Sequence, residues 1–381
     1  MKSVPSADRA TRAWIEVDAA ALRRNLRRVG AAVGERVRLL PMVKADAYGL
    51  GAGRAVHTLE AESPWGYGVA TLEEGRALRQ LGVGRPILVV APLPPGSYAD
   101  ALAYDLMPTV SDLAGVEALQ RAAHGRPAPF HVEVDTGMGR AGFAWGQVEA
   151  WGPVVLGGGH AGLRLEGCFT HFHSADEADA TPTRVQWERF RAALETLEGL
   201  GAPPDLIVHA CNSAGALRFP EYAADAVRPG IFLYGGRVGP GAPEPDPVVQ
   251  IRARVLHVRE AAPGSTVGYG ATHTAVGPER WATLGIGYGD GLPRALGNRG
   301  AALLGGIRVP VRGRISMDMT VVDITGMPAV RPGDVATLLG RDGPEEITLE
   351  EIAGHAGTIG YEILTGLTAR LPRIWVEDGG D

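Results

Sequence analysis

Strand-like and helix-like stretches alternate through the first 240 residues of this 381-residue chain. Short apolar runs predict strands, and runs with apolar residues at helical spacing lie between them. Counted with the apolar run that ends at Lys44, they give about eight strands. Strands that alternate with helices pair in parallel, and eight such units predict an N-terminal (β/α)8 barrel of the TIM type. A doubly wound sheet is the alternative, but no G-x-G-x-x-G motif follows the first strand.

The predicted elements of this α/β region have the following ranges. A helix over 19–29 is capped by Asp18, and further helices cover 52–60, 71–81, 98–103, 111–123 and 182–200. After the run that ends at Lys44, strands cover 67–70, 86–91, 107–110, 130–134, 167–171, 206–209 and 231–234.

A stretch rich in proline and glycine over 239–247 predicts a domain boundary. Beyond it the apolar residues recur with period two, which is typical of strands in an antiparallel sheet. We therefore predict a barrel domain over residues 12–240 and a mostly antiparallel β domain over 241–381. Strands are expected near 248–258, 281–286, 307–312, 319–324 and 334–339, and only 348–356 has a helical pattern.

Composition and charge exclude several classes of function. The net charge is −6 and no basic block is present, which argues against nucleic-acid binding. No apolar run approaches the length of a membrane span, and the polar N-terminus lacks a signal region, so we expect no membrane partner and a cytoplasmic protein. Cys168 and Cys211 lie in apolar runs and are expected to be free thiols. No metal-ligand spacing is present.

Lys44 follows an apolar run and precedes a glycine-rich turn. Burial lowers the pKa of a lysine and makes its amine a better nucleophile, which favours Schiff-base chemistry. A lysine that extends to solvent from a strand end is the alternative. Function in a parallel barrel lies at the carboxyl ends of the strands. Polar residues follow several later strands at that end, namely Arg140, His171, Asn212, Ser213 and Arg228.

The loops after the seventh and eighth strands of barrels often bind phosphate. Here they contain Asn212, Ser213, Gly230 and Ile231. A phosphate anchor together with a Schiff-base lysine indicates pyridoxal 5'-phosphate (PLP). If Arg228 faced the pyridine nitrogen, it could not accept a proton from the ring, which would favour proton movement at Cα over transamination.

The stretch Val43-Lys44-Ala-Asp-Ala-Tyr48-Gly-Leu-Gly resembles the PLP-attachment signature of alanine racemases. Further matches follow in the family's order and cover about residues 13–376. They are Asp135-Thr-Gly-Met-Gly-Arg140, Thr170-His171-Phe, Asn212-Ser213, Val227-Arg228-Pro-Gly230-Ile231, Gly268-Tyr269-Gly-Ala-Thr, Gly287-Tyr288-Gly-Asp-Gly, Ser316-Met317-Asp318-Met319, Thr358-Ile-Gly-Tyr361-Glu and Ala369-Arg-Leu-Pro-Arg373.

The resemblance implies a PLP-dependent enzyme that interconverts L-alanine and D-alanine and supplies D-alanine for peptidoglycan. It also implies a head-to-tail homodimer whose active sites lie at the subunit interface. Lys44 of one subunit and Tyr269 of the other would stand on opposite faces of the cofactor and act as the two bases. An ordinary phenol has a pKa of about 10, so Tyr269 would need assistance to act as a base near neutral pH. In the family, a hydrogen-bonded chain that runs through His171 toward Arg228 provides it.

The resemblance also implies roles for the other matching residues. Arg140 would bind the phenolic oxygen of the cofactor and contribute to substrate binding. The backbone of Met317, beside Asp318, would meet the substrate carboxylate. The phosphate would be held by Tyr48, Ser213, Gly230, Ile231 and Tyr361, with Asn212 close by. The entrance would be lined by Asp176, Tyr288, Arg294 and Tyr361.

Two positions depart from the family pattern. Many members carry a lysine that becomes carbamylated where this chain has Glu133, and we hypothesise that Glu133 supplies that negative charge directly. Ser316 replaces a frequent cysteine and is expected to change local packing only.

The alternatives left open are a broad-specificity or serine racemase and, in a different class, a non-catalytic PLP carrier. Such carriers lack the β domain, so Tyr269 argues against that class.

Overall fold

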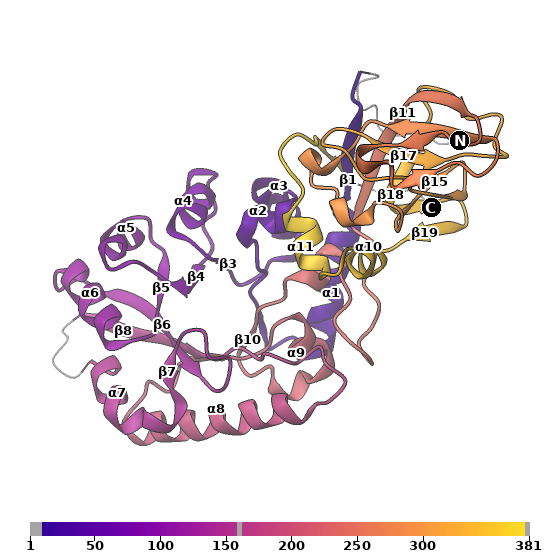
Figure 1. Cartoon of the computed structure of the whole chain (residues 1–381). Coiled ribbons are helices and arrows are strands. Elements are labelled where there is room, and N and C mark those ends of the chain that lie inside the picture. Colours follow the sequence, from indigo (N-terminus) through magenta and orange to yellow (C-terminus); the bar gives the residue numbers. More distant parts are fainter. Residues whose placement is uncertain (1–9, 158–161, 378–381) are drawn as a thin grey trace.

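The computed structural model describes residues 10–157 and 162–377 and consists of a curled parallel sheet surrounded by helices and a separate β domain (Figure 1). Six parallel strands form the curled sheet in the order β3 (Tyr67–Val69), β4 (Ile87–Pro92), β5 (Met107–Val110), β6 (Ala128–Asp135), β8 (Leu163–Phe169) and β9 (Ile207–His209). The short strand β7 (Phe143–Ala144) pairs with β6.

Two further parallel strands, β2 (Arg38–Leu39) and β10 (Ala226–Val227), pair with each other beside this sheet. The Val43 N–H donates to the Gly68 carbonyl at 2.9 Å, which connects the chain after β2 to β3. The Asp225 N–H donates to the Val208 carbonyl at 2.9 Å, which connects the chain before β10 to β9. The predicted TIM-type architecture is therefore confirmed, with regular pairing over six strands and a few irregular hydrogen bonds that join β2 and β10 to the two edges of that sheet.

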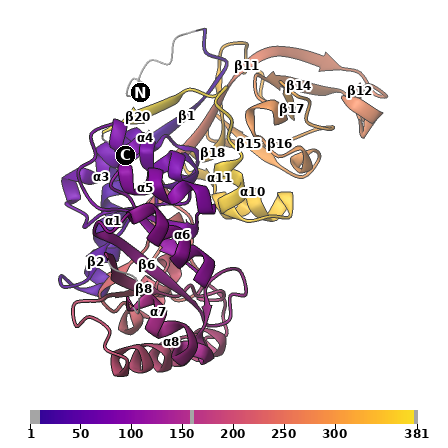
Figure 2. The same cartoon turned by 90° about the vertical axis from the view of Figure 1, so that its left-hand side faces the viewer.

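Helices lie on the outer side of the curled sheet (Figures 1 and 2). They are α1 (Ala19–Val33), α3 (Ala52–Leu59), α4 (Leu72–Gln80), α5 (Tyr98–Ala103), α6 (Leu113–Ala123), α7 (Val148–Val155), α8 (Thr181–Gly199) and α9 (Ser213–Arg218). The Asp18 carboxylate accepts from the Ala21 N–H at 2.8 Å, so the predicted cap of α1 is confirmed. Helices α7 and α9 were not predicted, because α7 contains Pro153 and α9 is only six residues long.

Two local predictions were wrong. Residues 231–234 form the 3-10 helix η5 (Ile231–Tyr234), and the eighth strand is β10. Four consecutive apolar residues have no period, so a buried helical turn and a buried strand look alike in the sequence. Lys44 does not end a strand either, because β2 ends at Leu39 and Lys44 begins the short helix α2 (Lys44–Gly49).

Helix α2 is left-handed over four residues. From Ala45 to Tyr48 the φ angles lie between 51° and 56°, although none of these residues is glycine. Left-handed backbone costs a residue with a Cβ about 1–2 kcal/mol. Surrounding contacts must therefore hold this turn directly beside Lys44.

The second domain contains a mostly antiparallel sheet, as predicted. Its main path is β16 (Ile307–Pro310), β15 (Ala301–Leu304), β18 (Val335–Asp342), β11 (Val249–Ala261), β1 (Ala13–Asp18) and β20 (Arg373–Val376), where only β1 and β20 pair in parallel. Additional strands are β14 (Glu279–Leu284) and β17 (Thr320–Asp323), β19 (Glu345–Ile347), and the pair β12 (Thr266–Val267) and β13 (His273–Thr274).

Strand β1 comes from the N-terminal end of the chain but lies in the sheet of the second domain. The domain boundaries at 12–240 and 241–381 stay predictions. The predicted helix near 348–356 is confirmed as α10 (Leu349–Ala356), and a second helix, α11 (Gly360–Thr365), follows it. No helix among the described residues is long and apolar enough to cross a membrane.

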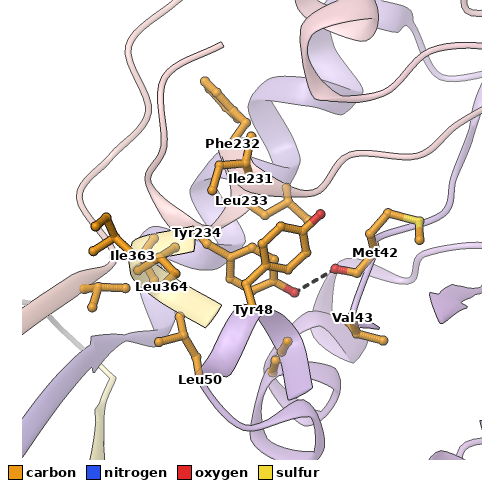
Figure 3. Close-up of a cluster of buried hydrophobic side chains, with 14 of the residues drawn as sticks. Met42, Val43, Tyr48, Leu50, Ile231, Phe232, Leu233, Tyr234, Ile363 and Leu364 are labelled. Atoms are coloured by element: carbon orange, nitrogen blue, oxygen red, sulfur yellow. Dashed lines mark hydrogen bonds between the residues drawn. The ribbon is translucent and has the colours of Figure 1, made fainter. Parts of the chain in front are cut away.

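The junction between the two parts is apolar and lies beside α2 (Figure 3). Tyr48 stacks on Tyr234 with ring centroids 4.6 Å apart, and the Tyr234 hydroxyl donates to the Met42 carbonyl at 2.8 Å. Ile363 and Leu364 of α11 are buried in the same cluster. The second domain therefore packs against the segment that carries Lys44.

Candidate active site

A cavity of about 100 Å³ lies at the carboxyl ends of the barrel strands. Every residue that the sequence predicted for cofactor binding lines it, together with Glu133. The full lining is Met42, Lys44, Tyr48, Val90, Glu133, Arg140, Phe169, His171, Asn212, Ser213, Arg228, Gly230, Ile231 and Tyr361. Most of these residues lie in the carboxyl-terminal parts of different barrel strands or in the segments that follow them, as expected for a parallel barrel, whereas Tyr361 comes from α11.

Lys44 is the only cavity residue that can act as an amine nucleophile. Burial lowers its pKa, and the positive charges of Arg140 and Arg228 lower it further, while the Glu74 carboxylate opposes them. The side-chain amine makes no hydrogen bond or ion pair with any described residue. An unengaged lysine with a lowered pKa is suited to nucleophilic chemistry.

The scarcity of lysine in the sequence is a further signal for Lys44. Of 37 basic lysine and arginine side chains, only Lys2 and Lys44 are lysines. Arginine can make almost any ion pair that lysine makes, but it cannot lose its proton to become an amine nucleophile. A lysine retained at the cavity in a chain so rich in arginine therefore supports a chemical role.

Arg228 is 4% exposed and lies beneath the cavity. Its guanidinium donates to His209 Nδ1 at 2.6 Å and to the carbonyls of Thr170 at 2.8 Å and Ala210 at 3.1 Å. Burial lowers the pKa of Arg228 to about 10. Its Nε–H has no acceptor among the described residues, so it remains available to a bound ligand.

A chain of two histidines supports Arg228. Because a guanidinium only donates, His209 Nδ1 must accept, and its Nε2–H then donates to His131 Nδ1 at 2.9 Å. Burial and the charge of Arg228 lower the pKa of His131 to about 3 and lower that of His209 well below its ordinary value. Both imidazoles are therefore neutral and cannot compete with Arg228 for a negatively charged partner.

His171 is also held neutral. Burial lowers its pKa, as do the charges of Arg228, Arg140 and Lys44. Its Nδ1 lies 3.4 Å from Arg228 Nη2, so Nδ1 accepts and Nε2 carries the proton. The predicted connection between His171 and Arg228 is present in the structure.

The predicted phosphate residues cluster on the side of the cavity nearest the second domain. Ser213 Oγ accepts from the Gly230 N–H at 2.7 Å, which leaves its own hydrogen free to donate. Tyr48 Oη lies so close to Gly230 that a Cβ there would stand 2.1 Å from it, so only glycine fits. The rings of Tyr48 and Tyr361 are 6.1 Å apart. Asn212 instead caps α9 through the Gly215 N–H at 2.9 Å.

The cavity carries an excess of positive charge. Lys44, Arg140 and Arg228 line it, and Glu133 is its only acidic lining residue. Glu133 is buried, and Ser111 Oγ donates to its carboxylate at 3.2 Å. Burial raises the pKa of Glu133, while that hydrogen bond and the charges of Arg140 and Arg228 oppose the rise. Such a charge balance suits a small ligand with several negative charges.

Several predicted site residues do not line this cavity within the described chain. Tyr269 and Met317 lie on the second domain, where their side chains are 69% and 51% exposed. The loop with Met317 is close to Tyr288, because the Gly289 N–H donates to the Met317 carbonyl at 2.8 Å. The other outlying residues are Asp176, Arg294 and Asp318. Burial raises the pKa of Tyr361 to about 12, with a smaller contribution from the charge of Asp176. Arg294 is exposed in a short 3-10 helix, and Asp318 pairs with Arg370 at 2.5 Å.

Sequence reasoning missed some residues that shape the cavity. Met42, Val90 and Phe169 line it, and Phe169 stacks on His209 with the Arg228 guanidinium 4.9 Å from its ring. Apolar lining residues give no chemical signal in a sequence. His209 lies at the end of β9, a position that favours a role beside the site.

No group of three or more histidine, cysteine, aspartate or glutamate side chains within the described ranges could hold a metal ion. Cys168 and Cys211 are free and buried, as predicted.

Models of two known domains match almost all of the chain. The alanine racemase N-terminal domain matches residues 17–238, and the alanine racemase C-terminal domain matches residues 248–375. The alanine racemase of Symbiobacterium thermophilum is 41% identical over 368 residues, which cover 95% of this chain and 96% of that protein. The alanine racemase of Halothermothrix orenii is 38% identical over 370 residues, which cover 94% of this chain and 96% of that protein.

Solved structures give the same result. The alanine racemase from Streptomyces lavendulae, a D-cycloserine producer, superposes with a TM-score of 0.91 at 32% identity and covers 97% of this chain and 98% of its own. The alanine racemase from Streptomyces coelicolor A3(2) has a TM-score of 0.90 at 34% identity, and the match covers 98% of this chain and 100% of that one. The resemblance inferred from the motifs is confirmed, and the chain belongs to the alanine racemase family.

Proposed function

We propose that this enzyme interconverts L-alanine and D-alanine with PLP bound at Lys44. The observation that carries the proposal is the joint position of Lys44 and Arg228 in one cavity with excess positive charge. Lys44 supplies an amine of lowered pKa, and Arg228 supplies an N–H without a partner in the described chain. A PLP-dependent racemase needs a lysine to anchor the cofactor and a partner for the ring nitrogen.

The residues present fit this cofactor. Lys44 would hold it covalently. The Ser213 hydroxyl, Tyr48 and the backbone at Gly230 and Ile231 would bind the phosphate, with Tyr361 beside them. Arg140 would meet the phenolic oxygen, and Arg228 the ring nitrogen. When bound, PLP withdraws electrons from Cα of an amino acid and makes its Cα proton acidic.

Arg228 determines which reaction follows. The guanidinium keeps its proton at neutral pH even with a pKa near 10, so it donates a hydrogen bond and transfers no proton to the ring. An uncharged ring withdraws electrons less strongly than a protonated one. That restriction favours removal and return of a single Cα proton over transamination.

Inversion requires proton transfer on both faces of Cα. We assign Lys44 Nζ to one face and Tyr269 Oη of the partner subunit to the other. The neutral His171, whose Nε2 carries a proton, can donate to that phenolic oxygen and stabilise it as a base. The partner's Met317 backbone would bind the substrate carboxylate, and Asp176, Tyr288, Arg294 and Asp318 would surround the entrance.

The assignment of Tyr269 requires a homodimer. Within one chain this side chain is 69% exposed and does not line the cavity of Lys44. Met317 and Met319 are exposed on the same domain, as are Tyr288 and Val276. Exposed apolar side chains of this kind mark interaction surfaces. Supply of D-alanine for peptidoglycan and a cytoplasmic location stay predictions from the family resemblance.

Two measurements test the proposal. Borohydride treatment in the presence of PLP should attach the cofactor to the peptide that contains Lys44. Lys2→Arg, which leaves Lys44 as the only lysine, serves as the matched control and should label like wild type. Labelling that survives in Lys44→Ala would contradict the anchor.

Exchange of the Cα hydrogen in deuterated water tests the two bases. The wild type should exchange both enantiomers while it interconverts them. Tyr269→Phe should lose interconversion by a factor of roughly 10³ but keep exchange on the enantiomer that faces Lys44. Equal exchange from both enantiomers in Tyr269→Phe would contradict the assignment. The same assay with serine in place of alanine tests the broad-specificity alternative.

A further inference from the structure

The left-handed turn after Lys44 needs partners that hold it in place. Ala45 to Tyr48 all have φ between 51° and 56°, and each carries a Cβ. Strained backbone of this kind persists only where neighbouring groups fix it. The turn begins at Ala45, the residue directly after Lys44.

One carboxylate binds that N–H and also fixes the neighbouring strand end. Glu74 Oε1 accepts from the Ala45 N–H at 2.7 Å. Glu74 Oε2 accepts from the Ala70 N–H at 2.7 Å and the Thr71 N–H at 3.3 Å, directly after β3. A single side chain on α4 therefore joins the end of β3 to the backbone that carries Lys44.

The role of Glu74 goes beyond capping its own helix. Two hydrogen bonds complete the cap of α4. The Glu74 N–H donates to Thr71 Oγ1 at 3.2 Å, and the Glu74 carboxylate accepts from the Thr71 N–H. The bond to Ala45 uses the other oxygen and contributes nothing to that cap. Both oxygens are engaged, so a glutamine, with one acceptor oxygen, could not replace it.

The charge of Glu74 also acts on Lys44. The charged groups that shift the Lys44 amine are Arg140 and Arg228, which lower its pKa, and Glu74, which raises it. Glu133 and the neutral His171 line the same cavity. Glu74 is thus the acidic group that opposes the effect of the two arginines on the pKa of Lys44.

We propose that Glu74 is a positioning residue for Lys44, which holds the left-handed turn through the Ala45 N–H and counters the charge of the two arginines. The proposal rests on the proposed role of Lys44 as the cofactor anchor. The structure gives Glu74 no direct part in the chemistry, because it does not line the cavity.

Titration of Lys44 in the full-length chain without cofactor tests the proposal. The rate of acetylation by acetic anhydride is followed against pH by mass spectrometry of the Lys44 peptide, and Lys2 serves as the internal reference. Glu74→Gln should move the midpoint of Lys44 to lower pH. Glu73→Gln, an exposed carboxylate on the same helix, is the matched control and should leave it unchanged.

Thr71→Ala separates positioning from helix capping. It removes the cap of α4 without removing the bond to Ala45, so it should lower Tm and leave the Lys44 midpoint at the wild-type value. A Glu74→Gln midpoint equal to that of wild type would overturn the proposal. So would a shift of equal size in Thr71→Ala.

Binding of PLP gives a second measurement. Loss of a charge-assisted hydrogen bond should raise the dissociation constant in Glu74→Gln by about tenfold or more. If Glu74→Gln does not fold, Glu74→Asp decides, because it keeps the charge but is too short to reach both the Ala45 N–H and the end of β3. Wild-type PLP affinity in Glu74→Asp would overturn the proposal. The titration requires no cofactor, so it tests Glu74 even if Lys44 proves not to be the anchor.

Discussion

Buried histidines in this enzyme are held neutral so that one arginine can keep its charge. Arg228 forms no ion pair with any carboxylate among the described residues, and its neighbours His209 and His131 accept along a chain of hydrogen bonds. His131 Nε2 is buried and has no partner among the described residues. Protonation of either histidine would place a second positive charge close to Arg228.

Acid should therefore destabilise the protein through these histidines. The unfolded chain binds protons to them near pH 6.5, whereas folding lowers the pKa of His131 to about 3. The free energy of unfolding should fall as the pH drops below about 6.5. In His131→Gln the fall between about pH 6.5 and 5 should be smaller, as measured by urea denaturation of the cofactor-free chain. An unchanged pH slope in this variant would contradict the assignment.

Glu133 gives a second prediction for a single residue. It is a buried carboxylate in the cavity of Arg140, so the enzyme should need no carbamylated lysine there. Added bicarbonate should not change the racemisation rate of the wild type. Glu133→Gln should lose roughly tenfold in kcat/KM because Arg140 loses a nearby negative charge.

Glu133→Lys is the matched test of that idea. Its activity should rise with bicarbonate, which would restore a negative charge by carbamylation. Activity of Glu133→Gln equal to that of wild type, together with a bicarbonate response in Glu133→Lys, would show that Glu133 does not supply the charge.

At the scale of single elements, the left-handed turn of α2 stores strain next to the reactive lysine. Ala45→Gly should relieve it at one exposed position, where φ is 51°. Glycine adopts this backbone without a steric penalty, which stabilises the folded state. Its greater conformational entropy in the unfolded chain offsets part of that gain. We expect a net stabilisation of about 0.5–1 kcal/mol in chemical denaturation.

The matched control is Ala31→Gly, in the exposed part of the regular helix α1. There glycine should destabilise the protein by up to about 1 kcal/mol. A loss of stability in Ala45→Gly of the same size as in Ala31→Gly would contradict the conclusion that the turn is strained.

The sequence predicted most elements because their patterns were long or their caps distinct. Helices α1, α4 and α10 directly follow Asp18, Thr71 and Thr348, each of which caps its helix. The strand-end rule also placed Arg140, His171 and Ser213 correctly around one cavity. The left-handed turn and η5 could not be predicted, because both depend on tertiary contacts such as Glu74 with Ala45 and Ser213 with Gly230.

At the scale of the whole molecule, the two domains are interdependent. Strand β1 begins the chain but completes the sheet of the second domain. Arg373, the first residue of β20 in that sheet, donates to the Gly49 carbonyl at 2.8 Å and so reaches the far end of the turn that follows Lys44. The position of the β domain is therefore coupled to the position of the lysine, a relation that no local pattern in the sequence reveals.

The proposed site is complete only in a dimer, and complementation tests that claim most directly. Lys44→Ala and Tyr269→Phe homodimers should each be inactive. When equal amounts are unfolded together and refolded, half of the dimers should be mixed, and each mixed dimer holds one site with both native residues. The mixture should recover about a quarter of the wild-type racemisation rate. No recovery, with mixed dimers present by native mass spectrometry, would show that Lys44 and Tyr269 serve the same site from one chain and would contradict the shared active site.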